Sequence, residues 1–267
     1  MKSLSLKYIN DLADINAERY QSTKPFPYIS FENFLHQEIA EQMVDDFPAV
    51  NESFYKYDNP LEKKYAFDKI SELPDSIKNT LTELNSPPFL NFLEKLTGIK
   101  GLIPDPYYRG GGIHQSKRGG KLDIHVDFNK HPKLKLERRL NVLIYLNKNW
   151  KEEYNGDFQI WDGYRDENGK HVLIDVAQKI YPTFNTFVCF NTSERSYHGF
   201  PEEIMCPEDM TRRSIALYYY TAKTDGEINI HSTTFVKLPH EDDSLNEMRE
   251  KRNEGRLASN IKDENLS

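Results

Sequence analysis

The most informative segment of this 267-residue chain reads Gly119-Gly120-Lys121-Leu122-Asp123-Ile124-His125-Val126-Asp127. The glycine pair marks a turn, and the run Leu122–Phe128 that follows it has the residue types of a β-strand. Residues i and i+2 of a strand point to the same side, so His125 and Asp127 should project together while Val126 faces the core. We therefore predict a strand that carries two potential metal ligands on one face.

A third candidate ligand, His198, lies far along the chain from this pair. It follows a β-type run and the polar segment Ser193–Tyr197, which places it just beyond the end of a strand. An isolated His-x-Asp triplet is weak evidence, but the preceding turn, the strand and the later histidine raise its weight. Two imidazoles and one carboxylate on one face leave about three positions open on a six-coordinate metal, as in non-haem Fe(II) oxygenases. We take His125, Asp127 and His198 as candidate metal ligands and catalytic residues.

The chain divides into three regions that we expect to form one folded unit. Residues 1–99 are predicted to be a mostly helical support region, with a short strand at Tyr28–Phe31 and helices over Leu4–Tyr20, His36–Phe47, Asp75–Leu84 and Phe89–Leu96. Residues 100–236 contain short β-type runs: Leu122–Phe128, Leu140–Asn147, Phe158–Trp161, Val172–Val176, Thr186–Asn191 and Ser214–Thr221. Residues 237–267 form a polar C-terminal tail, with a candidate surface helix over Ser244–Arg256 and ten final residues expected to be disordered.

The strand pattern of the middle region indicates the architecture. Short strands separated by Gly, Asn and Pro turns, without helical spacers, favour an antiparallel sandwich or jelly roll. The prediction is a mainly β fold with a helical N-terminal part, in which residues 100–236 form the catalytic core.

Residues 100–222 resemble the Fe(II)/2-oxoglutarate-dependent dioxygenases, and within them the prolyl-4-hydroxylase-like branch. The matching segments occur in one order and at compatible spacings: Gly119–Asp127, Arg139–Asn147 with Trp150, Gly156–Trp161, Pro182–Phe190, Tyr197–Gly199 and Arg212–Ser214. Their agreement is far more specific than any single motif. The resemblance implies a double-stranded β-helix, a distorted jelly roll whose mouth holds the iron, buttressed here by helices.

The resemblance also implies roles for individual residues. His125, Asp127 and His198 would be the iron ligands, and Arg212 would bind the distal carboxylate of 2-oxoglutarate. A planar guanidinium suits that role because it can bind a carboxylate bidentately. Arg213 is the rival, because neighbours in a strand point to opposite faces and only one of the two can point inward.

Further residues are candidates for the same pocket. Tyr145 aligns with a tyrosine that binds the cosubstrate in prolyl-hydroxylase-like enzymes, although a core tyrosine is an equal alternative. Asn141 and Leu143 share its face by the period of two. Gln115 falls where relatives carry another cosubstrate-contacting group of a different residue type. His114, near the glycine-rich turn, is a weaker candidate for the mouth of the site.

By resemblance, the protein is a hydroxylase that uses Fe(II), 2-oxoglutarate and O2, with ascorbate as a further candidate cofactor, and releases succinate and CO2. Asp127 supports hydroxylation, because halogenating relatives replace this carboxylate with Gly or Ala to make room for halide. The expected substrate is a prolyl or other amino-acid residue in a protein or peptide, and a free amino acid or other small metabolite is the alternative. We expect loops 128–136 and 162–170 to select it.

Two other functional classes stay open. A jelly-roll protein that binds a metal or ligand without catalysis predicts a broken triad or a missing cosubstrate arginine, and this chain has neither defect. A zinc hydrolase can use two histidines and a carboxylate, but that function gives no reason for Arg212.

Composition limits the partners. The formal charge of −7 and the pI near 5.7 give no global attraction to phosphate backbones, so we expect no nucleic-acid substrate. Cys189 and Cys206 do not form a metal-type pair, and Cys189 is expected to be a buried free thiol. No signal peptide and no run of the ~20 apolar residues of a membrane span is visible, which predicts a cytoplasmic protein that needs no membrane. A homodimer is a candidate assembly.

Overall fold

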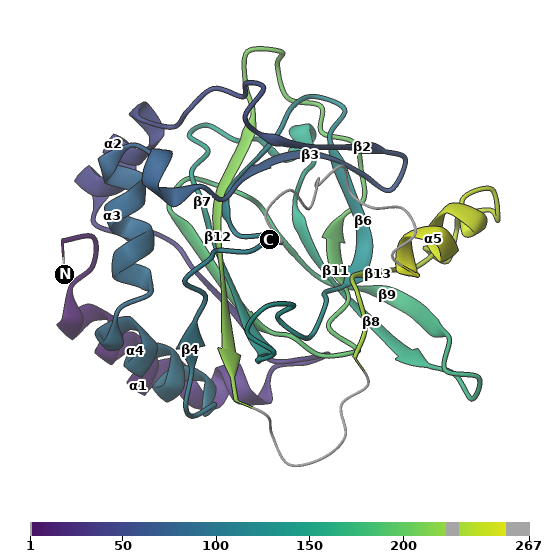
Figure 1. Cartoon of the computed structure of the whole chain (residues 1–267), viewed down its shortest axis with the longest axis horizontal. Coiled ribbons are helices and arrows are strands. Elements are labelled where there is room, and N and C mark those ends of the chain that lie inside the picture. The colour runs from purple at the N-terminus through teal and green to yellow at the C-terminus, as the bar shows by residue number, and fades with distance from the viewer. Residues whose placement is uncertain (1, 223–229, 255–267) are drawn as a thin grey trace.

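The computed structural model describes residues 2–222 and 230–254. Within these residues a thirteen-stranded antiparallel sheet curls into a nearly closed, barrel-like jelly roll, and the N-terminal helices pack on one side of it (Figure 1). The predicted fold class, a mainly β double-stranded β-helix buttressed by helices, is confirmed. None of the described helices is both long and apolar enough to cross a membrane.

The four N-terminal helices lie close to their predicted positions. They are α1 (Leu6–Ser22), α2 (Gln37–Asp45), α3 (Asp75–Leu84) and α4 (Pro87–Thr97). The Ser5 side chain caps α1 by accepting a hydrogen bond from the Tyr8 amide. Helix α4 starts with proline at its first position and ends at Gly98, whose φ of 76° is a left-handed conformation that suits glycine. Local residue preferences therefore set the start of α1 and both ends of α4.

Adjacent strands run antiparallel along the order β1-β10-β7-β12-β5-β3-β6-β11-β8-β9, with β2 beside β3, β4 beside β12 and β13 beside β6. The strands are β1 (Tyr28–Phe31), β2 (Tyr55–Asn59), β3 (Glu62–Phe67), β4 (Ile103–Pro104), β5 (Gly112–Ser116), β6 (Lys121–Val126), β7 (Glu137–Tyr145), β8 (Phe158–Arg165), β9 (His171–Ile180), β10 (Thr186–Asn191), β11 (His198–Phe200), β12 (Arg212–Thr221) and β13 (Thr234–Phe235). Short 3-10 turns occur at Ile70–Glu72 and Glu152–Tyr154.

The hairpin of β2 and β3 was not predicted. It lies in the region expected to be mostly helical, and β3 pairs with both β5 and β6 of the catalytic core. The sheet therefore continues across the expected boundary near residue 100. Lysines and acids dominate the hairpin, so the apolar alternation that would reveal a strand is weak there.

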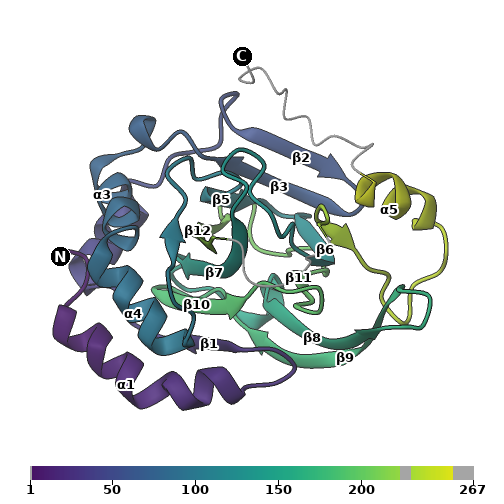
Figure 2. The same ribbon diagram turned by 60° about the horizontal axis from the view of Figure 1, so that its bottom comes forward.

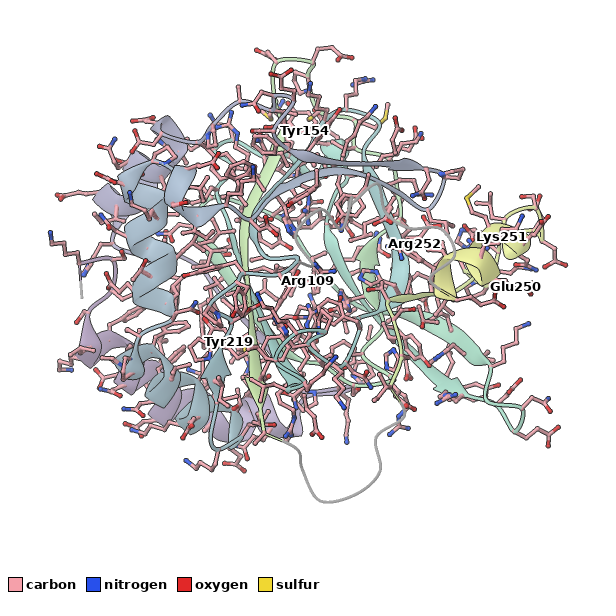
Figure 3. All side chains as sticks on the ribbon, viewed as in Figure 1. Arg109, Tyr154, Tyr219, Glu250, Lys251 and Arg252 are labelled. Atoms are coloured by element: carbon pink, nitrogen blue, oxygen red, sulfur yellow. The ribbon has the colours of Figure 1, made fainter. Side chains whose placement is uncertain are left out.

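The largest core lies between the helices and one face of the sheet, as Figure 2 shows for α1, α3 and α4. Phe34 stacks on Phe187 of β10 with ring centroids 4.1 Å apart. Tyr219 of β12, labelled in Figure 3, is buried on the helix side and donates a hydrogen bond to the Leu84 carbonyl at 2.8 Å. These contacts hold the sheet face against the helices, while the opposite face of the same strands lines the barrel interior.

The C-terminal segment packs on the core up to residue 254. Strand β13 pairs with β6, and helix α5 (Asn246–Asn253) occupies part of the predicted Ser244–Arg256 helix. Arg249 lies 3.4 Å from the Asp123 carboxylate, and Arg252 lies 3.1 Å from the carboxylate of Glu62. The ten final residues that were expected to be disordered lie outside the described residues.

Candidate active site

The three candidate metal ligands lie together on the inner face of the barrel. His125 is on β6, Asp127 directly follows β6, and His198 opens β11. The antiparallel register places His198 opposite His125. One potential ligand atom from each residue lies within 4.8 Å of the others. The Nε2 atoms of His125 and His198 are 3.7 and 3.4 Å from the Asp127 carboxylate oxygens.

Gly199 permits the close approach of the two strands that carry the histidines. A Cβ atom at this position would lie 2.6 Å from the Leu122 carbonyl oxygen and 2.8 Å from that of Asp123. Any larger residue would push β11 away from β6, and His198 would move with it. The glycine is therefore part of what brings the ligands together.

Backbone carbonyls orient both imidazoles. Nδ1 of His125 is 2.9 Å from the Asp123 carbonyl oxygen, and Nδ1 of His198 is 2.8 Å from the Ser196 carbonyl oxygen. A carbonyl can only accept, so each Nδ1 carries a proton and each Nε2 is turned toward Asp127. Burial, together with the neighbouring His198, lowers the pKa of His125. This favours the neutral form that a metal requires.

The Asp127 carboxylate is held ionised and in one orientation. Its Oδ2 accepts hydrogen bonds from Asn141 Nδ2 at 2.6 Å and from Arg138 at 3.1 Å. Burial alone would raise the pKa of Asp127, but the charge of Arg138 opposes this effect and the pKa lies well below its usual range. Two imidazoles and one ionised carboxylate on one side of a cavity suit a 2-His-1-carboxylate metal site with open positions.

The ligands face a cavity of about 80 Å³. It is enclosed by aromatic rings and by charged side chains from several strands. The lining residues are Lys64, His114, Leu122, His125, Asp127, Arg138, Asn141, Leu143, Tyr145, Phe158, Phe190, His198, Gly199, Phe200, Arg212, Ser214 and Tyr218. Asn141, Leu143 and Tyr145 all reach it from β7, as the period of two predicts.

Arg212, and not its neighbour Arg213, points into this cavity. Its Nε donates to the Gly156 carbonyl at 2.7 Å, and its Nη2 lies 3.2 Å from the Tyr145 hydroxyl. Arg213 donates to the Thr211 hydroxyl at 3.1 Å on the other side of β12. Within the described residues no carboxylate lies within 4.0 Å of Arg212, which is only 6% exposed. A buried guanidinium without an acidic partner fits a ligand carboxylate, as 2-oxoglutarate would supply.

Gln115 does not line the cavity, whereas His114 does. Strand β5 turns Gln115 to the outer face, where its amide donates to the Pro48 carbonyl at 2.8 Å and accepts from the Thr211 hydroxyl at 3.2 Å. His114 donates to the Gly110 carbonyl at 3.0 Å, and burial, aided by the nearby charge of Lys64, lowers its pKa to about 3. The placement gives Gln115 no contact through which it could bind a cosubstrate in the cavity.

Lys64 is a charged cavity residue that sequence reasoning missed. It comes from β3, in the hairpin that was not predicted, and the only signal for it would have been the assignment of that strand. Of the two loops expected to select the substrate, residues 162–170 line neither the catalytic cavity nor the larger cleft beside it. Phe128, Lys130 and Pro132 of the other loop do line that cleft, whose volume is about 420 Å³.

Comparison with known families and structures agrees with this geometry. The model of the family described as 2OG-Fe(II) oxygenase superfamily matches residues 111–220, which include the three candidate ligands. The match also covers Tyr145 and Arg212. No curated protein sequence matches the chain.

Solved structures of prolyl hydroxylases share the fold. A prolyl hydroxylase of Trichoplax adhaerens, in complex with a peptide fragment of the hypoxia inducible factor oxygen degradation domain, is 19% identical with a TM-score of 0.54, over 80% of this chain and 91% of that one. A Pseudomonas putida prolyl-4-hydroxylase is 10% identical with a TM-score of 0.50, and the match covers 79% of this chain and 99% of that one. A Phytophthora capsici prolyl 4-hydroxylase is 14% identical with a TM-score of 0.51, and the match covers 93% of this chain and 75% of that one. At these identities the likeness establishes a common fold.

Proposed function

We propose that the chain is a 2OG-Fe(II) oxygenase that hydroxylates an unactivated C–H bond of a prolyl or other amino-acid residue in a protein or peptide. The match of residues 111–220 to the family model supports the use of Fe(II), 2-oxoglutarate and O2, and the His125, Asp127 and His198 cluster would supply the metal ligands. Succinate and CO2 would be the products of the cosubstrate.

The observation that carries the choice of a polypeptide is the cleft of about 420 Å³ next to the catalytic cavity. Phe128 lines the cleft, and its ring lies 4.5 Å from the guanidinium of Arg138, which lines the cavity. The two spaces therefore adjoin at this pair. An extended chain can lie in such a cleft while one residue reaches toward the metal, whereas a small metabolite needs only the inner cavity. The peptide bound by the Trichoplax adhaerens structure supports the same choice.

The site residues of this chain would bind the metal and the cosubstrate through separate groups. Bound iron supplies activation of O2 for attack on the C–H bond. Asp127, fixed by Asn141, and the two oriented imidazoles would hold the metal with several positions open. The Arg212 guanidinium and the Tyr145 hydroxyl would bind the distal carboxylate of 2-oxoglutarate.

Aromatic rings keep water from one side of the metal site. Phe190 and Phe158 pack on His198 with ring centroids 4.6 and 5.5 Å away. Both side chains belong to the apolar cluster of the barrel interior. Exclusion of water there strengthens the electrostatic contacts of the site and protects reactive species from side reactions.

A free amino acid or other small metabolite is the second candidate, and the charges of Lys64 and Arg138 in the cavity favour it. A small charged substrate would need such groups to fix its orientation. Turnover assays with free proline beside proline-containing peptides, with and without ascorbate, separate the two candidates by which one raises succinate formation.

The cofactor assignment is tested by anaerobic addition of Fe(II) and 2-oxoglutarate. We expect a visible metal-to-ligand charge-transfer band in the wild type, its loss in His198→Ala and its weakening in Arg212→Ala. Peptide hydroxylation is then followed by mass spectrometry as a gain of one oxygen atom. A folded, iron-loaded wild type without the band would overturn the site assignment, and a band without any peptide product would overturn the choice of a polypeptide.

A further inference from the structure

Lys64 is a largely buried cation in the catalytic cavity that the proposed reaction does not use. Its side chain is 17% exposed, and its nearest carboxylate within the described residues is that of Glu62, 3.9 Å away. Glu62 is already engaged, because Arg252 lies 3.1 Å from it. Burial lowers the pKa of Lys64, and the nearby charges of Glu62 and Asp127 offset this effect only in part.

The other charges of the cavity do not supply a counter-ion for this lysine. The Asp127 carboxylate is occupied by Arg138 and Asn141. His114 is neutral, and Arg212 is a further cation whose free donors suit the cosubstrate. The cavity thus keeps a net positive charge once Fe(II) and 2-oxoglutarate are bound. A buried ammonium of this kind is stabilised strongly by an anion that enters with the substrate.

Lys64 also borders a second cleft, which is strongly basic. This basic cleft has a volume of about 200 Å³ and lies between the β2–β3 hairpin and the turn from β5 to β6. Its lining includes five cations and a single acid, although the whole chain carries a net charge of −7. The charged lining residues are Lys56, Asp58, Lys63, Lys64, Lys117 and Arg118.

The ion pairs of the basic cleft leave it available to an anionic ligand. Lys56 pairs with Asp58 at 2.6 Å, and Lys63 lies 3.7 Å from Glu203, but all four side chains are about half exposed. Exposed pairs of this kind contribute little to stability and exchange readily. Lys117 contacts the Tyr65 ring at 5.5 Å. An extended acidic segment could therefore replace these contacts.

We propose that Lys64 binds a substrate carboxylate next to the residue that is hydroxylated, and that the basic cleft binds further acidic residues of the same polypeptide. The substrate class is then an acidic peptide segment. This inference rests on the proposed polypeptide hydroxylation. Lys64 lines both spaces, with its ammonium on the same face of the hairpin as Tyr57, so the two spaces meet at this residue and one polypeptide could occupy both.

The test uses fluorescent synthetic peptides with one central proline, flanked either by glutamates or by glutamines. Binding to the full chain loaded with Mn(II) and 2-oxoglutarate is measured by anisotropy at low and at physiological salt. The variants are Lys64→Gln, Lys117→Gln and, as the matched control, Lys7→Gln on the exposed face of α1. The affinity for 2-oxoglutarate is measured in parallel from the charge-transfer band with Fe(II).

We expect wild type and Lys7→Gln to bind the glutamate peptide at least about tenfold more tightly than the glutamine peptide. Lys64→Gln should lose most of that preference, Lys117→Gln part of it, and added salt should reduce it. The affinity for 2-oxoglutarate should stay within about twofold of wild type in all variants. These results would establish Lys64 as a residue that determines substrate specificity, even if neither peptide is turned over.

Three results would overturn the inference. The first is equal binding, or no binding, of both peptides by the wild type. The second is a loss of 2-oxoglutarate affinity in Lys64→Gln with the peptide preference intact, which would make this lysine a cosubstrate anchor. The third is tighter binding of a single-stranded oligonucleotide of equal charge than of the glutamate peptide. Failure of the proposed function looks different, because it would abolish hydroxylation while the binding preference remained.

Discussion

Replacement of Asn141 by leucine should weaken metal binding by about 10- to 100-fold without unfolding the protein. Asn141 donates a hydrogen bond of 2.6 Å to the Asp127 carboxylate, and its own carbonyl accepts one of 2.9 Å from Arg138. It thus fixes the metal-ligating carboxylate directly and also holds the arginine that keeps this carboxylate ionised. Leucine has a similar size but can make neither bond.

The magnitude follows from the kind of bond that is lost. A hydrogen bond to a charged group contributes about 1.5–3 kcal/mol. Each 1.4 kcal/mol is a factor of about ten in an equilibrium constant, which gives roughly 10- to 100-fold. Loss of a partner that orients a metal ligand typically has the same effect, about 10–100-fold in metal affinity. Because Asn141 is neutral, its removal does not change the electrostatic repulsion on the incoming cation.

The assay is a titration of apoprotein with Mn(II), followed by the EPR signal of the free ion, with thermal unfolding as the test of folding. Asn191→Leu is the matched control. Asn191 lies on the adjoining strand β10, opposite Leu140, and its side chain accepts a hydrogen bond of 2.7 Å from Tyr20. That variant should lose stability but keep its metal affinity. An unchanged dissociation constant in Asn141→Leu, or an equal change in Asn191→Leu, would refute the reasoning.

Further predictions concern the cosubstrate, the C-terminal helix and the response to acid. Arg212→Met should raise the dissociation constant of 2-oxoglutarate at least about 30-fold, because it removes one partner of a buried charge pair. The control Arg213→Met should leave this constant within about threefold of wild type. Both constants are measured from the charge-transfer band. Arg252→Met leaves the buried Glu62 carboxylate without its nearest cation, so it should lower the free energy of unfolding in urea by about 3 kcal/mol. Lys251→Met, on the exposed side of α5 (Figure 3), should lower it by less than about 0.5 kcal/mol. The pKa of His114 is lowered from 6.5 to about 3, so below pH 6.5 the unfolded chain binds a proton that the folded chain does not. Stability should therefore fall as the pH drops from about 6.5 to about 3, and the fall should be shallower in His114→Gln; equal slopes of unfolding free energy against pH would contradict this.

The parts of the site that follow from a local pattern could be predicted from the sequence. His125 and Asp127 share a face because a strand has a period of two, and the same rule puts Asn141, Leu143 and Tyr145 in one pocket. Each of these inferences needs only the assignment of one strand. The distance from His125 to His198, in contrast, depends on the register of β6 with β11, which no local pattern contains.

The sequence did not show which of two neighbouring strand residues faces the cavity. Gln115 was a candidate because it falls where relatives carry a cosubstrate-contacting group, but in β5 it is His114 that lines the cavity. Arg212 and Arg213 posed the same choice, and only the family pattern, not the local alternation, distinguished them. Lys64 was out of reach for a different reason. Its strand pairs with β2 in a hairpin that the sequence pattern did not reveal, and with β5 and β6, which follow about 50 residues later.

The C-terminal segment completes the strand that carries two of the metal ligands. On one edge β6 pairs with β11, and on the other it pairs with β3 near Leu122 and with β13 at Val126 and His125. Without β13 the ligand-bearing end of β6 would be an open edge, whose backbone groups would be free to pair elsewhere. Phe235 of β13 also packs on the His125 ring, with centroids 5.5 Å apart. Because α5 is tied to β3 and β6 through Arg252 and Arg249, the same ion pairs that hold the C-terminal segment in place also restrain the metal ligand and the strand of Lys64.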